Sequence, residues 1–357
     1  MPARRTRRVP RHVLVIGGAG FIGSNVADAF RREGAAVTVF DNFSRPGAAA
    51  NSRWLKTRHR RGLRVLHGDI LTAGRRLRRL VDDADFVIHN AGQVAVTTSV
   101  ADPRTDFQIN AAGTLEVLEA VRHSRRRPPL VFSSTNKVYG GLDGVPVTRR
   151  GMRYAFVSSP RGVGEDAPLD FHSPYGCSKG AADQYVRDYA RIYDLPTVVF
   201  RKSCIYGPRQ FGVEDQGWVA WFTIAAVRGL PLTIYGDGKQ VRDVLYIDDL
   251  VRAYLAAFRR IDAVAGEIFN IGGGPANTLS LLELLAMLRE LTGRPVRAHH
   301  EGWRPGDQVI YVSDVRKAAR RLGWAPSVSP AEGVRRLHAW VAEHPELFDR
   351  PRAKKRR

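Results

Sequence analysis

The sequence predicts a doubly wound α/β fold, a parallel sheet covered by helices on both faces, followed by a smaller C-terminal lobe. Through residues 12–203, short apolar runs of strand length alternate with stretches of helical period. A glycine-rich turn at residues 17–23 joins the first apolar run to the first helical stretch. After about residue 203 the alternation stops and the elements become smaller. Alternating strands and helices are typical of a parallel sheet buried on both faces.

The elements of the first part follow one another at short intervals. Each expected strand is an apolar run bounded by turn residues, and each expected helix repeats its apolar residues every three to four positions. We expect strands at residues 12–16, 37–40, 63–66, 86–89, 130–133 and 197–201, and helices at residues 24–32, 105–121 and 179–192.

The last third of the chain is expected to form the smaller lobe. Glycine- and proline-containing turns such as residues 272–275 separate its elements. A long polar segment, residues 141–172, is either a surface insertion or part of the mouth of a site, because long loops in compact domains usually have a function. In this lobe we expect helices at residues 218–228, 250–258 and 281–291 and a strand at residues 232–235.

Composition places the chain among ordinary globular proteins. Its 357 residues suffice for two domains of ~100–200 residues each, and 44% hydrophobic with 25% charged residues exclude a wholly disordered chain. Apolar runs stay shorter than the ~18 residues of a membrane span. Two cysteines, Cys177 and Cys204, are too few for a disulfide scaffold and form no metal-ligand cluster, so we expect no metal and a reducing cytoplasm.

The net charge of +21 is unusual. Only 8 of the 56 basic residues are lysine, and the arginine runs are scattered without aromatic residues between them. A groove for nucleic acid would need such aromatic residues as stacking platforms. We therefore interpret the charge as free use of arginine on the surface and do not expect a nucleic-acid partner.

The glycine-rich turn predicts a dinucleotide site. Gly17 permits a tight turn, Gly20 lets the backbone approach a pyrophosphate, and Gly23 allows close packing of helix on strand. Asp41 follows the second strand, where its carboxylate would accept a hydrogen bond from a ribose and repel a 2′-phosphate, which favours NAD over NADP. Arg45 weakens that preference, because an arginine can accommodate the extra phosphate. The carboxyl ends of the third and fourth strands, residues 68–70 and 90–92, are further candidates.

A tyrosine and a lysine four positions apart predict the chemistry. Tyr175 and Lys179 would share one face of a helix. A nearby ammonium group would lower the pKa of the phenol from its ordinary ~10 toward neutrality, so that it can accept a proton from a substrate hydroxyl. The spacing alone occurs often by chance. Its support is Thr135, which ends an expected strand and offers a second hydroxyl for the same substrate oxygen.

Together these motifs resemble the extended short-chain dehydrogenase/reductase superfamily of NAD-dependent epimerases and dehydratases, over residues 12–345. Further segments agree with it, namely RKSCIYGP at residues 201–208, VRDVLY at 241–246, FNIG at 269–272 and RPGD at 304–307. The resemblance implies an NAD-binding Rossmann domain at residues 12–203 with the insertion at 141–172. It also implies a mainly substrate-binding lobe at 204–345, with the chain free to cross between lobes, and basic tails at 1–11 and 346–357.

The superfamily acts on nucleotide-diphospho-sugars, and the residues after Thr135 narrow the reaction. Residues 136–140, NKVYG, contain no carboxylate that could act as general acid for elimination. Epimerisation or net dehydrogenation therefore remains. Several blocks resemble the CDP-paratose 2-epimerases (CDP-tyvelose epimerases) more closely, namely residues 91–99, 133–140, 170–185, 209–211, 215–218 and 238–245.

That closer resemblance implies a tightly bound NAD, transient oxidation of the sugar at C2, and re-reduction on the other face. Tyr175 would be the base, Lys179 its partner and the ribose anchor, and Thr135 the second partner of the hydroxyl. The residues that would hold NAD are Gly17, Gly20, Phe21, Ile22, Gly23, Asp41, Asn42, Ser44, Asp69, Ile70, Ala91, Gly92, Gln93, Asn110, Ser133, Tyr175 and Lys179. Those that would bind the substrate are Thr135, Asn136, Ser203, Cys204, Arg209, Gln210, Gln216, Trp218, Arg242 and Arg304.

Two positions depart from the superfamily pattern. Cys204 stands where many relatives carry a substrate-binding asparagine, and Lys202 adds a charge beside it. These departures leave the base and the sugar of the substrate open. The alternatives are a UDP-glucose-type 4-epimerase and, from another class, a non-catalytic NAD-bound protein with a basic surface for nucleic acid. The resemblance also implies a homodimer or tetramer.

Overall fold

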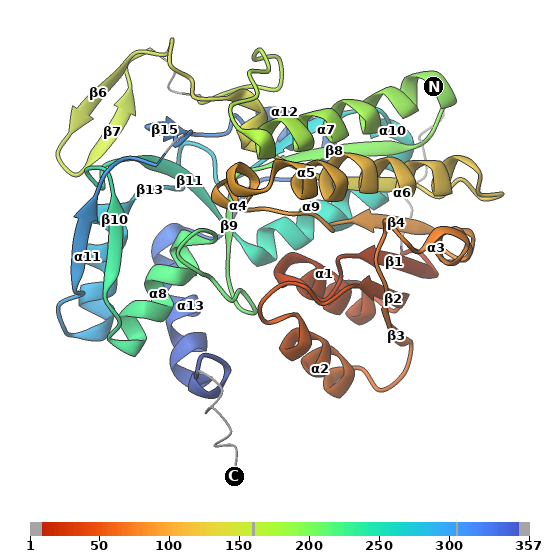
Figure 1. The fold of residues 1–357 in the computed structure, drawn as a ribbon, viewed down its shortest axis with the longest axis horizontal. Coiled ribbons are helices and arrows are strands. Elements are labelled where there is room, and N and C mark those ends of the chain that lie inside the picture. The colour runs from red at the N-terminus through yellow and green to blue at the C-terminus, as the bar shows by residue number, and fades with distance from the viewer. Residues whose placement is uncertain (1–8, 159–160, 305, 350–357) are drawn as a thin grey trace.

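The computed structural model, in which residues 9–158, 161–304 and 306–349 are described, confirms the doubly wound α/β fold. Seven parallel strands form one sheet in the order β12-β8-β5-β4-β1-β2-β3 (Figure 1). The order reverses beside β1, where ligands of such sheets bind. The strands are β1 (His12–Ile16), β2 (Ala36–Asp41), β3 (Leu63–His67), β4 (Phe86–His89), β5 (Leu130–Thr135), β8 (Thr197–Lys202) and β12 (Ile268–Ile271).

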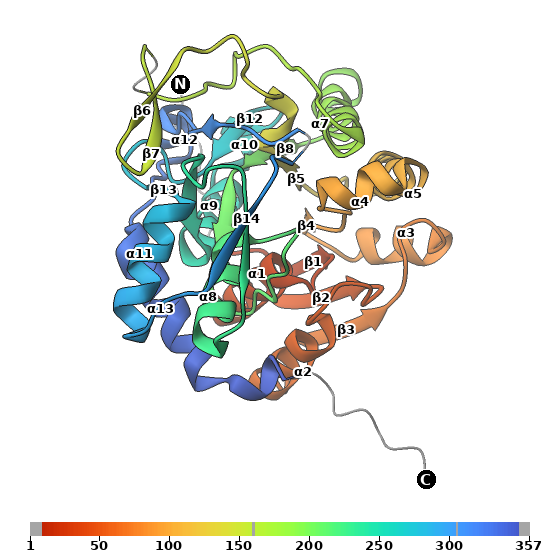
Figure 2. The ribbon, with the colours of Figure 1, turned by 60° about the vertical axis from the view of Figure 1, so that its left-hand side comes forward.

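Helices cover both faces of this sheet (Figures 1 and 2). On one face α1 packs against α2 and α9, and on the other face α6 packs against α3 and α7. The apolar residues under each layer form two buried clusters. The helices are α1 (Phe21–Arg32), α2 (Ala48–Arg58), α3 (Gly74–Asp82), α4 (Val96–Ala101), α5 (Pro103–Phe107), α6 (Gly113–Arg122), α7 (Pro174–Tyr193), α9 (Ile247–Arg259), α10 (Ile261–Val264) and α12 (Arg316–Leu322).

The helix expected at residues 105–121 is interrupted. Gln108–Ala112 (η1) adopts a π-helical turn between α5 and α6. Such wide turns often mark functional sites because they displace a side chain from its helical position. Here the turn carries Asn110, which is buried and bonded to the neighbouring loop and helix. A periodicity argument cannot find this interruption, since the apolar spacing on either side stays helical.

The second lobe is built from small sheets and three packed helices. It contains a parallel pair, β10 with β14, and a sheet in which β11 pairs with β13, β15 and β9. Helix α8 packs against α11 and α13. The elements are β9 (Cys204–Tyr206), α8 (Trp218–Arg228), β10 (Leu232–Tyr235), β11 (Val241–Tyr246), β13 (Thr278–Ser280), α11 (Leu281–Thr292), β14 (Ala298–Glu301), β15 (Ile310–Tyr311) and α13 (Pro330–Glu343).

The chain crosses between the lobes more than once. Residues 247–271 return to the first sheet, where α9 covers one face and β12 forms an edge. The insertion contributes a two-stranded hairpin, β6 (Val147–Arg150) with β7 (Arg153–Phe156), which packs on β11, β13 and β15. Most of the expected tails, residues 1–8 and 350–357, lies outside the described residues. Pro345–Leu347 forms a short 3₁₀ turn, η3.

A buried ion pair fastens the longest helix to the sheet. Arg201 of β8 donates two hydrogen bonds of 2.9 Å to the carboxylate of Asp183 on α7. Ser134 of β5 donates a third, at 2.7 Å, and Tyr139 accepts one from Arg201 at 3.1 Å. Both charged side chains are almost fully buried. Because a planar guanidinium matches both carboxylate oxygens, the pair fixes where α7 begins above the strand ends.

We expect Arg201→Met to lower the free energy of unfolding by about 3–5 kcal/mol, because it leaves the Asp183 carboxylate buried without its partner. Urea denaturation followed by circular dichroism measures this. Arg122→Met is the control, since the Arg122–Glu119 pair is about one-third exposed and should cost no more than about 1 kcal/mol. Equal losses in the two variants would contradict the structural role of the buried pair.

Candidate active site

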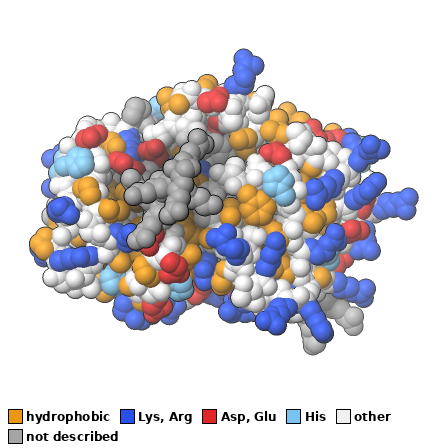
Figure 3. All heavy atoms as spheres, turned by 60° about the horizontal axis from the view of Figure 1, so that its bottom comes forward, with side chains coloured by type: hydrophobic (Ala, Val, Ile, Leu, Met, Phe, Trp, Pro, Cys, Tyr) orange, Lys and Arg blue, Asp and Glu red, His pale blue; other side chains and the backbone are white. Residues whose placement is uncertain are grey.

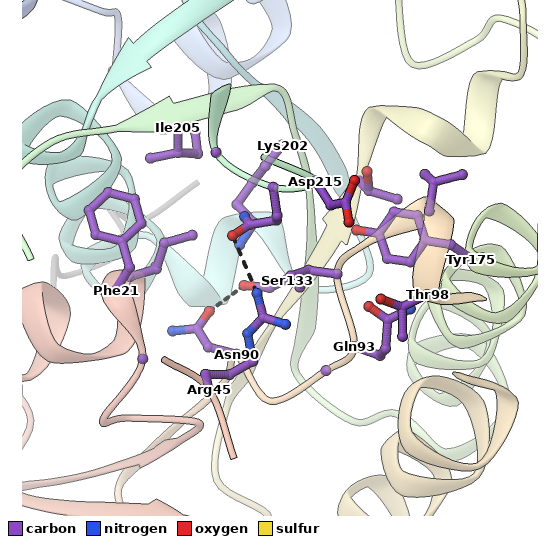
Figure 4. Close-up of a pocket in the computed structure, with 18 of the residues that line it drawn as sticks. Phe21, Arg45, Asn90, Gln93, Thr98, Ser133, Tyr175, Lys202, Ile205 and Asp215 are labelled. Carbon is purple, nitrogen blue, oxygen red and sulfur yellow. Dashed lines mark hydrogen bonds between the residues drawn. The ribbon is translucent and has the colours of Figure 1, made fainter. Parts of the chain in front are cut away.

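A cleft of about 700 Å³ runs between the two lobes (Figure 4). The carboxyl ends of β1, β2, β4, β5 and β8 form one wall, and the second lobe supplies the other through segments near α8, β10 and β11. Polar side chains at the ends of neighbouring strands therefore face one space, as expected at the point where strand order reverses.

The glycine turn has the geometry that the sequence predicts. Gly17 has a φ of +73°, and a Cβ atom at Gly23 would lie 2.2 Å from the carbonyl oxygen of Gly17. A Cβ at Gly20 would have only one neighbour, at 3.4 Å, so this backbone borders open space. Asp41 accepts hydrogen bonds from the amides of Ala19 (2.9 Å) and Phe43 (2.7 Å). The carboxylate thus holds the turn and also lines the cleft.

Most of the other residues predicted to hold the cofactor line the same cleft. Asn42 donates a hydrogen bond of 2.7 Å to Asp69, and Ser133 bonds to Asn90 and, at 2.6 Å, to Tyr254. Those that line the cleft are Gly17, Gly20, Phe21, Ile22, Gly23, Asp41, Asn42, Ser44, Asp69, Ile70, Ala91, Gly92, Gln93, Ser133, Tyr175 and Lys179.

Asn110 is placed differently. It does not line the cleft but lies beneath it, fully buried, where it accepts a hydrogen bond from the amide of Gln93 (3.0 Å) and donates one to Ser178 (3.1 Å). The structure therefore gives Asn110 the position of a support between the loop after β4 and helix α7.

Helix α7 presents the tyrosine and the lysine to the cleft. Ser173 caps its first turn by accepting a hydrogen bond from the amide of Gly176 at 3.1 Å, and Pro174 occupies the first helical position. The amide of Tyr175 donates to Ser99 Oγ at 3.1 Å. The Lys179 ammonium lies 4.1 Å from the centre of the Phe132 ring. Both functional side chains are buried.

The pKa values of this pair differ from the expectation. Burial raises the pKa of Tyr175 to about 12, although a hydrogen bond with Thr135 and the charge of Arg45 lower it, and the charge of Asp106 raises it. Burial also lowers the pKa of Lys179 to about 7, against the attraction of Asp183 and Asp106. The prediction that Lys179 brings the phenol toward neutrality is therefore wrong for the protein chain alone. Desolvation disfavours both charged forms, and it outweighs the neighbouring charges.

Two of the arginines predicted to bind a diphosphate face the cleft. Arg242 is buried and forms an ion pair of 2.6 Å with Asp307. The guanidinium of Arg304 lies 3.7 Å from the centre of the Tyr235 ring and 3.1 Å from Asp215. Each can turn a donor toward a phosphate without leaving its partner, because a guanidinium carries five N–H groups.

The third arginine is placed elsewhere. Arg209 borders the cleft, but its guanidinium lies 4.3 Å from the ring centre of Trp54 and 5.4 Å from that of Trp340. These rings belong to α2 and α13 and border a second cavity. The structure therefore does not group the guanidinium of Arg209 with those of Arg242 and Arg304.

The remaining predicted substrate residues line the cleft as a polar wall. Trp218 donates a hydrogen bond to the Cys204 sulfur at 3.3 Å, and Ser203 donates one to the carbonyl of Asp243 at 2.8 Å. Gln210 donates a bond of 3.3 Å to the carbonyl of Ile205, and its Oε1 has no partner among the described residues. The set that lines the cleft is Thr135, Asn136, Ser203, Cys204, Gln210, Gln216, Trp218, Arg242 and Arg304.

Comparison with known proteins decides the family. Residues 13–272 match the NAD dependent epimerase/dehydratase family. The chain belongs to this family. It is 45% identical to CDP-paratose 2-epimerase of Salmonella typhi, over 92% of this chain and 99% of that protein.

Solved structures agree with this assignment. UDP-glucose 4-epimerase of Thermotoga maritima with UDP-glucose is 32% identical, with a TM-score of 0.79, covering 94% of this chain and 99% of that one. UDP-glucuronic acid 4-epimerase of Bacillus cereus, in complex with UDP-glucuronic acid and NAD, is 29% identical, with a TM-score of 0.80, covering 93% and 99%.

Membership of the epimerase/dehydratase family makes the chain an NAD-dependent enzyme, and the residues present fit that cofactor. The turn that a Cβ at Gly23 would block and the open backbone at Gly20 suit a pyrophosphate. The side-chain nitrogen Nδ2 of Asn90, buried at the cleft, has no hydrogen-bond partner among the described residues. Asp41 also lines the cleft, where its carboxylate could accept a hydrogen bond from a ribose hydroxyl. Arg45, which also lines the cleft (Figure 4), donates a hydrogen bond of 3.3 Å to Gln216 Oε1.

Other features expected from the sequence fall outside the cleft. None of the described residues of the insertion, 141–158 and 161–172, lines it. Lys and Arg side chains gather on one half of the face shown in Figure 3. Within the described part of the chain, no group of three or more His, Cys, Asp or Glu side chains is arranged to hold a metal ion. No described helix has both the length and the apolarity to cross a membrane.

Among the cationic residues that line the cleft, Arg45, Lys137 and Lys202 are absent from the predicted set of cofactor- and substrate-binding residues. Lys202 ends β8, in register with Thr135 of β5 and Ile271 of β12. Burial and the charge of Lys179 lower its pKa to about 7, and no ion pair reaches it from any described residue. A second cation directly after Arg201, at the end of a buried strand, is the signal that could have identified it, because a lysine is rarely buried unless it is paired.

We expect Lys202→Met to raise the free energy of unfolding at pH 7 by roughly 1–3 kcal/mol, because it removes a partly buried ammonium that has no carboxylate beside it among the described residues. The pKa of Lys202 in the folded chain, about 7, lies below its ordinary 10.5. Between these values the unfolded chain binds more protons, so the stability of the native protein should rise with pH. Urea titrations at pH 7 and pH 9 should show this slope for the native protein and a smaller slope for Lys202→Met. The surface variant Lys56→Met should keep the slope, and an unchanged slope in Lys202→Met would refute the burial of its charge.

Proposed function

We propose that the protein is an NAD-dependent nucleotide-sugar 2-epimerase that acts on a CDP-hexose, such as CDP-paratose giving CDP-tyvelose. The observation that carries this proposal is the grouping of Thr135, Tyr175 and Lys179 in one cleft with the NAD-type glycine turn. The similarity to CDP-paratose 2-epimerase over nearly the whole of both chains supports the choice of carbon and of base. Asn136 and Lys137, which follow Thr135, carry no carboxylate, and this argues against elimination of a hydroxyl.

Each catalytic residue has a distinct task in this reaction. Tyr175 accepts the proton of the C2 hydroxyl and later returns it, while Thr135 orients that hydroxyl through its own Oγ. Lys179 supplies positive charge one helical turn from the phenol. When bound, NAD supplies reversible hydride transfer, so that oxidation at C2 and re-reduction on the opposite face give the epimer without net redox change.

The raised pKa of Tyr175 fits a base that is set up only in the loaded site. A phenol with a pKa of about 12 is a weak base at neutral pH while it remains protonated. In the filled site, from which water is excluded, a positive charge close to the Tyr175 hydroxyl would favour the phenolate strongly, since charges interact more strongly at low dielectric. The proposal therefore assigns activation of Tyr175 to the assembled complex and not to Lys179 alone.

Product analysis tests the proposed reaction directly. Incubated with CDP-paratose and NAD in deuterated water, the protein should yield the C2 epimer with its carbon-bound hydrogen retained, because the hydride returns without exchange. Proton NMR identifies the inverted carbon and the isotope. Inversion at C4 of a UDP-hexose would favour the 4-epimerase alternative, and no epimer from any CDP- or GDP-hexose would reject the proposal.

Tyr175→Phe should reduce turnover by roughly 10²–10⁴-fold, the usual contribution of general acid–base catalysis. The variant removes only a hydroxyl, so NAD binding and the unfolding midpoint should change little. Steady-state kinetics with a fluorescence titration of NAD separates the effects. Turnover equal to that of the native protein would remove Tyr175 from the mechanism.

We also infer that the enzyme works as a homo-oligomer in the cytoplasm. Helices α5 and α7 expose apolar side chains on the face away from the sheet, among them Phe107 (57% exposed), Tyr185 (48%) and Ile192 (64%). Apolar side chains gathered on neighbouring helices are typical of a surface that a second copy covers. Sedimentation velocity of the native protein would test this.

A further inference from the structure

Lys137 has a fixed position between the catalytic groups. It lies on the 3₁₀ turn Asn136–Tyr139 (η2) that follows β5, and its amide donates a hydrogen bond of 3.2 Å to Thr135 Oγ. Its carbonyl oxygen would lie 3.4 Å from a Cβ built on Gly176, the residue after Tyr175. The backbone of Lys137 is therefore held against both the catalytic strand end and the first turn of α7.

The side chain of Lys137 runs into the cleft and stops beside Asp307. Its ammonium donates a hydrogen bond of 3.2 Å to the carbonyl of Gly306 and lies 3.9 Å from Asp307 Oδ1. The same Oδ1 accepts a hydrogen bond of 2.6 Å from Arg242. Only 19% of the Lys137 side chain is exposed.

Two cations, the buried Arg242 and the largely buried Lys137, thus share one carboxylate. Burial and the charge of Arg242 lower the pKa of Lys137 to about 8, while Asp307 and the Cys204 thiol oppose the shift. The charges of Arg242, Lys137 and Arg304 together hold the pKa of Asp307 below its ordinary value. The cluster of Lys137, Arg242 and Asp307 therefore carries more positive than negative charge. A ligand that brings a phosphate into the cleft would supply the missing negative charge.

The chemistry of the proposed reaction requires a phosphate at this place. The C2 hydroxyl sits on the carbon next to the anomeric carbon, which carries the diphosphate, whereas the C4 hydroxyl lies across the sugar ring. When Tyr175 and Thr135 hold the C2 hydroxyl, the sugar-linked phosphate must lie close to them. Lys137, whose backbone amide is bonded to Thr135, carries its ammonium into the same cleft.

We propose that Lys137 binds the sugar-linked phosphate of the substrate, together with Arg242, and so places C2 against the catalytic tyrosine. This inference rests on the proposed function and adds to it a residue that positions the substrate. Arg304 stands farther along the cleft, over Tyr235 and beside Asp215, where it would serve the nucleoside side of the diphosphate.

Calorimetric titration of the NAD-loaded protein with CDP and with CMP tests the proposal, because only CDP has the phosphate that corresponds to the sugar-linked one. We expect Lys137→Met to bind CDP roughly 10- to 100-fold more weakly, as is usual when one partner of a buried charge pair is removed. Its affinity for CMP and for NAD should stay within about two-fold of the native values. Lys137→Gln should behave in the same way, and Lys137→Arg should retain most of the CDP affinity.

Lys56→Met, an exposed change on α2, is the matched control and should bind all three ligands normally. Equal losses for CDP and CMP, or weaker NAD binding in Lys137→Met, would assign the ammonium to another phosphate and overturn the inference. Normal CDP binding by both Lys137→Met and Lys137→Gln would overturn it while leaving the 2-epimerase proposal intact. If the native protein bound neither CDP nor UDP, the nucleotide-sugar function itself would fail.

Discussion

The cleft depends on buried and partly buried positive charge that the protein alone does not neutralise. Lys137, Lys179 and Lys202 all reach the space where the carboxyl ends of the strands meet. Burial lowers the pKa of each of them, and the nearby carboxylates offset only part of this cost. Such a site is unfavourable for stability and favourable for binding phosphates and dinucleotides, whose negative charge completes it. Because burying these charges is unfavourable, the residues around the site must hold them in place.

Polar contacts of helix α7 with the sheet and with the loop after β4 hold the site in place. The Arg201–Asp183 pair fixes the helix to β8, and Asn110 on the π-helical turn ties it to the loop after β4. These residues do not reach the cleft, yet they set where Tyr175 and Lys179 project. Because reacting groups must be held closely in position, the polar residues beneath the site would support the proposed reaction through geometry.

The pKa of Tyr175 depends on more than its spacing to Lys179. The spacing of Tyr175 and Lys179 correctly indicates that the two side chains share a helix face and a cleft. It does not indicate that both are buried, and burial acts on the two pKa values in opposite directions. The phenol becomes harder to ionise and the ammonium easier to neutralise than the same groups in water. The balance between desolvation and charge is a property of the folded environment and cannot be read from spacing.

The sequence by itself determined the doubly wound sheet, the glycine turn, the strand-end threonine and the tyrosine–lysine helix, because each depends on local periodicity or on a motif of adjacent residues. Only the tertiary structure decided which distant charges meet. It places the guanidinium of Arg209 between Trp54 and Trp340, turns Arg45 toward Gln216, and brings Lys137 and Arg242 to the same oxygen of Asp307. The position of a long flexible side chain depends on the cavity around it. Residues of both lobes line that cavity, so it exists only in the folded protein.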